Sequence, residues 1–248
     1  MKFLNKLNNN KIFLFLYSLI FILYVVLLPQ TGHGYDMWCW REWCSYGFRE
    51  GLSKIYNSGT DYLPFYHYIL WIFGRFQGSV KSIETNIYYI KVITLIFDFI
   101  AGFILIRIIS KKYSDKYEIF SLSLFYFLNI FVLYNSVIWG QVDGIMTCLV
   151  FLSFYNASNH KILLSVIFII LALNIKLQAI IFLPFIGLIL LPPIVQQFSW
   201  KKITHWIAAT VITQVLILLP FIINGSMPKV WEVVINSFHK YPVVHECL

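Results

Sequence analysis

Charged side chains are scarce in this sequence. Only 12% of its 248 residues are Asp, Glu, Lys or Arg, whereas 59% are hydrophobic. Uninterrupted apolar runs extend for about 20 residues, the length that a helix needs to cross a bilayer. Such runs exclude a soluble globular domain, and a transmembrane β-barrel would instead show alternating segments of about ten residues. The sequence therefore predicts an all-α polytopic membrane protein.

Cysteine is also rare, and none of the four is spaced as a metal ligand or a redox pair. Cys39 and Cys44 do not share a helix face, Cys148 lies inside an apolar run, and Cys247 is next to the end of the chain. We interpret all four as unpaired small hydrophobic residues. Motifs of zinc proteases, serine hydrolases, nucleotide-binding loops and dinucleotide folds are absent as well. The net charge of +8 does not indicate nucleic-acid binding, because the basic residues cluster in short loops as cytoplasmic anchors do.

Seven apolar segments have the composition of membrane spans. The first follows an N-terminal basic stretch and lacks a cleavage site, so we expect a retained helix rather than a signal peptide. The predicted spans are residues 12–28, 86–107, 118–138, 143–158, 161–175, 179–195 and 203–224.

An eighth apolar run, Tyr62–Phe76, is too short to cross, since 15 helical residues reach only about 22 Å. If it did cross, the basic loops after it would fall outside, against the positive-inside rule. We therefore predict a surface helix within a long first outer loop, residues 29–85. The N-terminus and the loops 107–117, 159–161 and 196–202 are then cytoplasmic.

This topology gathers polar residues on the outer face, and we expect some of them to form one site. The alternative for Asp36 is that it caps a helix, and the alternative for Asp143 is that it simply occupies a helix N-terminus. Lys176 either reaches past the helix end to water or meets an anionic group. Intramembrane Asp98 indicates either function or a hydrogen bond between helices. The predicted outer-face residues are Asp36, Asp61, Gln141, Asp143, Lys176 and Gln178.

The stretch from Asp61 to His67 reads as a helix start. Asp61 is expected to be the N-cap and Pro64 to lie in the first turn. Tyr62 and His67 could line the floor of a pocket or anchor the helix among the lipid headgroups.

Several motifs in order resemble the GT-C class of membrane glycosyltransferases, over about residues 30–185. They are an outer Asp after the first span, Gly51-Leu52-Ser53-Lys54-Ile55-Tyr56, Asp61-Tyr62-Leu63-Pro64-Phe65-Tyr66, Trp139-Gly140-Gln141-Val142-Asp143 and Lys176-Leu177-Gln178. The likeness is to polyprenol-phosphate-mannose-dependent family 87 enzymes and the second-mannose transferases of GPI-anchor synthesis. It implies a seven-helix module with surface helices in its first outer loop, and inverting transfer of a sugar, mannose, to a hydroxyl.

The resemblance also implies roles for individual residues. Asp36 would be the catalytic base and Asp143 a second catalytic acid that positions the acceptor or a divalent cation, Mg or Mn. Gln141 would bind sugar or phosphate, and Lys176 would neutralise the departing polyprenyl phosphate. The partners implied are a polyprenyl-phosphate sugar donor, a glycan or lipid acceptor, and membrane lipids. The substrate-binding residues predicted in all are Gln141, Lys176, Gln178, Tyr62 and His67.

The sequence departs from the GT-C pattern in two places. Leu63-Pro64 stands where a Pro-Pro is expected, and the chain stops in an outer loop after the seventh span. We therefore expect residues 1–248 to be a single module of a truncated copy. The alternatives are a lipid-linked-sugar flippase or transporter subunit, or an inactive fragment that only binds or scaffolds. The Lys-, Asn-, Ile- and Phe-rich composition favours a bacterial inner membrane.

Overall fold

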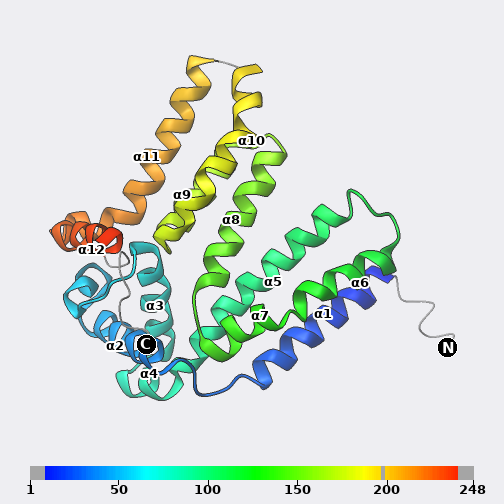
Figure 1. Ribbon diagram of the computed structural model, residues 1–248. Coiled ribbons are helices and arrows are strands. Elements are labelled where there is room, and N and C mark those ends of the chain that lie inside the picture. The colour runs from blue at the N-terminus through cyan, green and yellow to red at the C-terminus, as the bar shows by residue number, and fades with distance from the viewer. Residues whose placement is uncertain (1–8, 197–198, 240–248) are drawn as a thin grey trace, which may run out of the picture.

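The computed structural model describes residues 9–196 and 199–239, and every regular element in this part of the chain is a helix. Figure 1 shows two diverging arms of helices that are joined at one end by a cluster of shorter helices. The prediction of an all-helical protein is therefore confirmed.

The first arm contains α1 (Asn9–Val26), α5 (Ile90–Ile109), α6 (Lys116–Phe127) and α7 (Ile130–Leu133), which continues as the π-helical turn η4 (Tyr134–Trp139). Aromatic rings hold these helices together. The ring of Phe127 lies 4.8 Å from that of Tyr17 and 4.9 Å from that of Phe99. Gly102 on α5 admits this ring, because a Cβ there would collide with it.

The second arm contains α8 (Asp143–Ser158), α9 (Ile162–Leu173), η5 (Leu177–Phe182), α10 (Leu183–Gln196) and α11 (Trp200–Ile223). Small residues let α8 and α9 approach closely. Ser153 donates to the Ser165 carbonyl at 2.8 Å, and both serines and Ala157 are buried. Small and hydroxyl side chains at a helix interface are typical of membrane bundles.

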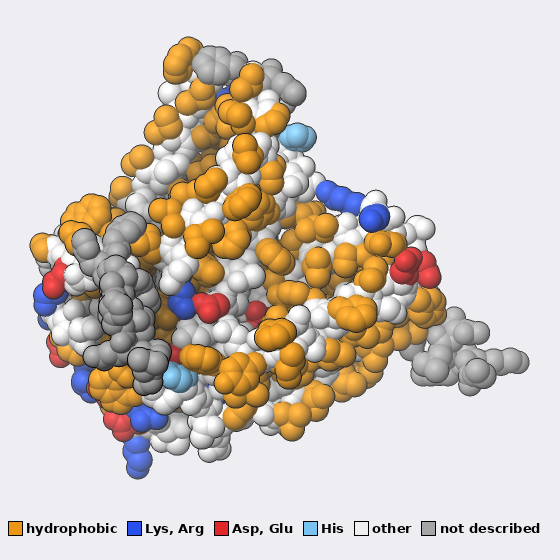
Figure 2. Space-filling view, in the orientation of Figure 1, with side chains coloured by type: hydrophobic (Ala, Val, Ile, Leu, Met, Phe, Trp, Pro, Cys, Tyr) orange, Lys and Arg blue, Asp and Glu red, His pale blue; other side chains and the backbone are white. Residues whose placement is uncertain are grey.

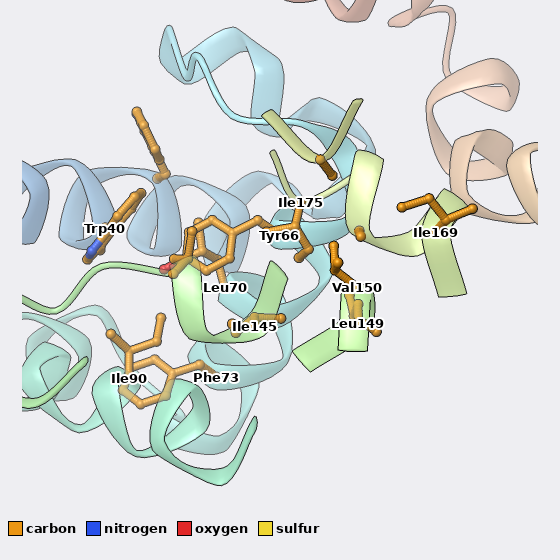
Figure 3. Packing of buried hydrophobic residues seen from close by; sticks show 14 of the residues in the cluster. Trp40, Tyr66, Leu70, Phe73, Ile90, Ile145, Leu149, Val150, Ile169 and Ile175 are labelled. Atoms are coloured by element: carbon orange, nitrogen blue, oxygen red, sulfur yellow. The ribbon is translucent and has the colours of Figure 1, made fainter. Parts of the chain in front are cut away.

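The segment between α1 and α5 forms most of the cluster that joins the arms. It contains α2 (Gly34–Glu50), η2 (Leu52–Ser58), α3 (Pro64–Gln77), α4 (Val80–Asn86) and η3 (Ile87–Tyr89), and α12 (Met227–His239) lies beside η2. Figure 3 shows the core beneath it, in which Trp40 and Tyr66 lie near Ile145 at the base of α8. This core fixes the cluster of shorter helices to the arms.

The seven predicted spans are not all supported by the helices observed. By length and composition two helical stretches could cross a membrane, Val80–Ile109 and Trp200–Ile223. A third candidate is the pair α6 and α7–η4, which is bent by 43° at Asn129. The other apolar helices are shorter because they break, as at 174–176. Twelve residues of α9 extend only about 18 Å, against a hydrocarbon core of about 30 Å.

The Tyr62–Phe76 run forms α3, which is not among the candidate spans. Pro64 occupies its first turn as predicted, but Asp61 does not cap it. The residue before the helix is Leu63, and no side chain caps the N-terminus. The structure therefore corrects the interpretation of Asp61 as an N-cap.

Figure 1 shows that the basic loops lie at the free ends of the arms. The α5–α6 connection carries Lys111 and Lys112, the α8–α9 connection carries Lys161, and α11 begins with Lys201 and Lys202. The cluster of α2, α3, α4 and α12 lies at the opposite, joined end. The fold thus separates the basic loops from the predicted site residues.

Candidate functional site

A pocket of about 1190 Å³ with both polar and apolar walls lies at the joined end of the arms. Its walls come from α2, the η2–α3 connection, the turn before α8, the α9–η5 connection and α12. Figure 2 shows acidic and basic side chains side by side in the hollow between the arms, within a largely hydrophobic surface. Of the predicted site residues, Asp36, Tyr62, Gln141, Lys176 and Gln178 line the pocket.

Asp36 connects α2 to the turn before α8. Its Oδ2 accepts hydrogen bonds from Trp139 Nε1 at 2.7 Å and from Gln141 Nε2 at 2.6 Å. His33 Nδ1 lies 3.2 Å from the same oxygen, and its ring stacks on that of Trp139. His33, not Asp36, is the residue that precedes α2, and Asp36 lies in the first turn. Asp36 therefore does not act as the helix cap.

Gln141 joins the two predicted acids into one network. Its Oε1 accepts from Lys176 Nζ at 3.0 Å and from the Tyr62 hydroxyl at 3.4 Å. Lys176 Nζ in turn lies 2.5 Å from Asp143 Oδ1. The contacts therefore link four side chains in the order Asp36, Gln141, Lys176 and Asp143. Their roles in a site stay a prediction from the sequence.

Glycine makes the turn that carries Gln141 possible. Gly140 has a φ of 92°, in the left-handed region where a side chain is disfavoured. A Cβ at this position would lie 3.1 Å from Met37 Sδ and 3.3 Å from Lys91 Cε. This turn ends the π-helical η4 and directs Gln141 towards α2.

Lys176 follows α9, where the backbone becomes extended before η5. Its side chain is 17% exposed and that of Asp143 is 40% exposed. The ammonium also lies 5.6 Å from the centre of the Tyr62 ring, within cation–π range. The charge of Lys176 is therefore already balanced by a carboxylate of the same chain.

Acidic residues outnumber basic ones around the pocket. Asp36, Asp61 and Glu232 line it together with Lys176 and Lys229. An anionic ligand would meet net negative charge here, whereas a neutral, hydroxyl-rich ligand or a cationic one would not be repelled. The aromatic walls, which include Trp40, Trp43 and Tyr62, give flat apolar surface beside these polar groups.

His67 does not line the pocket. It is completely buried beneath it, with Nε2 lying 3.0 Å from the Tyr62 carbonyl and 3.3 Å from Thr60 Oγ1. Burial lowers the pKa of His67 to about 3, because a charged imidazole cannot be solvated there. The structure thus makes it a neutral core residue, neither a pocket floor nor a headgroup anchor.

The described part of the chain contains no cluster of side chains that could bind the predicted divalent cation. Residues 9–196 and 199–239 contain no group of three or more His, Cys, Asp or Glu side chains that could hold a metal ion. Asp36 and Asp143 are linked through Gln141 and Lys176 instead of facing a common gap. Mg or Mn binding stays a prediction from the sequence.

Lys91 is a buried cation that the sequence analysis missed. It lies fully inside the protein, and its Nζ donates to the carbonyls of Pro29 at 3.1 Å and Val137 at 3.0 Å. The Thr31 and Ile138 carbonyls also contact it. Lys91 therefore ties the α1–α2 connection and the end of η4 to α5, behind the Asp36–Trp139 contact.

The apolar helices that are long enough to cross a bilayer mark the chain as a membrane protein, and its pocket lies at the joined end of the two arms. The chain belongs to the GPI transamidase subunit PIG-U family, whose model matches residues 46–242. That range includes Gln141, Asp143 and Lys176 but not Asp36. Comparisons with curated proteins and with solved structures give no match.

The family corrects the resemblance drawn from the sequence. The chain is not a GT-C glycosyltransferase, so its assignment as a mannosyltransferase enzyme is wrong, and so is the polyprenyl-phosphate sugar donor as partner. The flippase and inactive-fragment alternatives and the bacterial inner membrane are not supported either. The short motifs misled because Trp-Gly-Gln-x-Asp can order a pocket wall through hydrogen bonds without any sugar-transfer chemistry.

Proposed function

We propose that this chain is a membrane subunit of a GPI transamidase, resident in the endoplasmic reticulum, and that it acts by binding. The family match over residues 46–242 supports membership of that complex. The partners would then be the other proteins of the transamidase. A role in binding also fits the contacts of Asp36 and Asp143, because each carboxylate already accepts hydrogen bonds from donors of the same chain.

The ligand that fits the pocket is the glycan of a glycosylphosphatidylinositol. Sugars present hydroxyls around apolar ring faces, and the pocket offers amides and carboxylates between aromatic walls. Its excess of acidic residues favours a hydroxyl-rich or amine-bearing group over a phosphate. In this proposal the lipid phosphate stays outside the pocket, and Lys176 organises the wall instead of neutralising a leaving group.

The observation that carries the proposal is the placement of Gln141. Its amide donates to Asp36 and accepts from Lys176, which holds both polar ends of the wall in fixed positions before any ligand arrives. A preorganised wall costs less entropy on binding than a mobile one. Gln178, two residues after Lys176 in the sequence, adds a second amide to the lining of the pocket.

We also propose that the shorter apolar helices α1, α8, α9 and α10 cross the membrane together with α5, α6–α7 and α11. They run within the same two arms as the longer spans, and large apolar side chains such as Phe15, Phe185 and Leu188 are exposed on them. Broken helices can cross where neighbouring helices satisfy their freed backbone groups. Under this topology the basic loops are cytoplasmic and the pocket faces the lumen.

The test separates assembly from ligand binding. Cells lacking the chain are given tagged wild type, Gln141→Ala, or the control Lys54→Met, whose side chain is exposed outside the pocket. Two quantities are measured: recovery of transamidase subunits with the tag, and GPI attachment to a surface reporter.

We expect all three to recover the subunits. Gln141→Ala should lower GPI attachment at least tenfold, and Lys54→Met should leave it unchanged. Full attachment with Gln141→Ala would refute the pocket as the GPI site. Failure of the wild-type chain to recover any transamidase subunit would refute membership of the complex.

A further inference from the structure

Helix α12 has three distinct faces. Val230 is buried, and Met227 and Val233 pack with it against Leu52, Ile55 and Phe221. Lys229, Glu232 and Asn236 line the pocket. A third stripe carries Trp231 and Ile235, which are 62% and 53% exposed although both are large and apolar.

The position of α12 along the membrane normal is fixed by its neighbour. The candidate span α11 ends at Ile223, and α12 begins only four positions later, at Met227. Gly225, with a φ of 69°, makes the turn, and Ser226 donates to the Ser53 carbonyl at 2.7 Å. With α11 crossing the bilayer as proposed above, α12 lies at the level where α11 leaves the hydrocarbon.

The apolar surface does not stop at that turn. Leu219, Ile222 and Ile223 at the end of α11 are 42%, 46% and 77% exposed. Figure 2 shows hydrophobic side chains that continue from the flank of α11 on to the segment that Figure 1 labels α12. The exposed stripe of α12 thus extends the surface that α11 presents to lipid.

We propose that α12 is an interfacial helix whose Trp231 and Ile235 insert between the lipid headgroups. Tryptophan suits this zone, since its ring is apolar and its N–H prefers a polar partner. The strong segregation of apolar and polar faces is typical of helices that lie in the interface. Lipid is favoured over a protein partner because the stripe is continuous with a span and adjoins its end.

A consequence is that the bilayer sets the height of the pocket. The pocket-lining face of α12 carries Lys229 and Glu232, and Lys229 Nζ donates to Asn57 Oδ1 at 2.6 Å. The pocket mouth would then open at headgroup level, where a lipid-attached ligand lies. The interfacial placement rests on the proposed crossing of α11, but not on membership of the transamidase or on a GPI ligand.

The test uses the full chain in phosphatidylcholine nanodiscs, with single labels on α12. The parent chain carries Cys247→Ser and retains the three buried cysteines. Any labelling of these cysteines is measured on the parent and subtracted. Trp231→Cys, Ile235→Cys and the control Glu232→Cys each receive an environment-sensitive fluorophore. Quenching by lipids with a doxyl group high on the acyl chain is compared with quenching by aqueous iodide.

We expect doxyl lipid to quench positions 231 and 235 at least twofold more than position 232, with the reverse order for iodide. Equal quenching at all three positions would overturn the proposal. A second result would also overturn it: iodide reaches the labels at 231 and 235 freely in nanodiscs, and these labels become protected only when other subunits are present. A protein partner, and not lipid, would then cover the stripe. Agreement between positions 231 and 235 guards against a local effect of either substitution.

Discussion

Lys176 Nζ and Asp143 Oδ1 lie 2.5 Å apart and join the connection after α9 to the start of α8. Both residues were predicted at the outer face, but for contact with a substrate. Their contact with each other changes the interpretation, because the wall of the pocket is held by an internal ion pair. Gln141 extends this pair to Asp36.

Replacement of the lysine should therefore loosen the wall. We expect Lys176→Met to lower the free energy of unfolding by about 1–2 kcal/mol, because Asp143 and Gln141 lose a charged donor; the partial exposure of Asp143 keeps the loss at this level. Lys54→Met removes the exposed Lys54–Glu50 pair, at 3.8 Å, and should change stability by less than about 0.5 kcal/mol. The free energies of unfolding of the two variants are compared in mixed micelles. Equal losses would show that the Lys176–Asp143 pair stabilises the protein no more than an exposed ion pair does.

Replacement of Lys91 should destabilise the protein more than replacement of Lys176. Lys91→Met leaves the carbonyls of Pro29 and Val137 without their donor in a buried place. We expect a loss of about 3 kcal/mol, since unsatisfied buried groups cost about 1–3 kcal/mol each. The matched control is Lys81→Met on α4, where the side chain is exposed. Similar unfolding midpoints for the two variants would contradict this account.

The sequence was sufficient to predict the helical class, a helix that begins at Pro64, and the proximity of Asp36, Gln141 and Lys176. Those features follow from apolar run length, from Pro64 and from charge asymmetry, which act locally or through the membrane. The lengths of the spans were not predictable in this way, because the breaks at Asn129 and at 174–176 lie inside apolar runs. The role of Lys91 depends on four carbonyls from distant segments, which no local pattern specifies.

Function was the least predictable part. The motif around Gln141 does lie in a hydrogen-bond network, but a short motif indicates which residues are near each other and not what they do. Asp36 has the residue type of a general base, yet the structure surrounds it with the donors Trp139 and Gln141. Only the family match distinguished a transferase from a transamidase subunit.

Gly144 allows α8 to approach α5 beside the buried Asp98. A Cβ at Gly144 would collide with the Asp98 carboxylate and lie 2.9 Å from Thr94 Cγ2. We expect Gly144→Ala to cost about 1–3 kcal/mol through overpacking. Gly187→Ala on α10 meets no atom within 4 Å and should be neutral or stabilising by about 0.5–1 kcal/mol.

The double variant Asp98→Ala, Gly144→Ala identifies the cause of that loss. If the carboxylate is the obstacle, the second alanine should cost less in the Asp98→Ala background than in the wild type, as a double-mutant cycle would measure. Strict additivity would mean that Gly144 is needed for another reason.

His67 should make the fold sensitive to acid. Its pKa is about 3 in the folded protein and about 6.5 when unfolded, so between these values the unfolded state binds the extra proton. Its contribution is complete above pH 6.5 and is lost as the pH falls towards 3, by about 1.4 kcal/mol for each pH unit. His67→Gln should flatten this slope in unfolding measurements between pH 6.5 and 5, whereas His205→Gln, at an exposed position, should not. An unchanged slope in His67→Gln would show that other groups cause the acid sensitivity.

The central claim is that this chain serves GPI attachment as a transamidase subunit. The most direct measurement is the amount of GPI-anchored reporter on cells from which the chain has been removed, before and after the wild-type chain is restored. The account predicts that the reporter precursor accumulates without its anchor and that restoring the chain returns anchored reporter to its original level. Normal anchoring in the complete absence of the chain would contradict the claim.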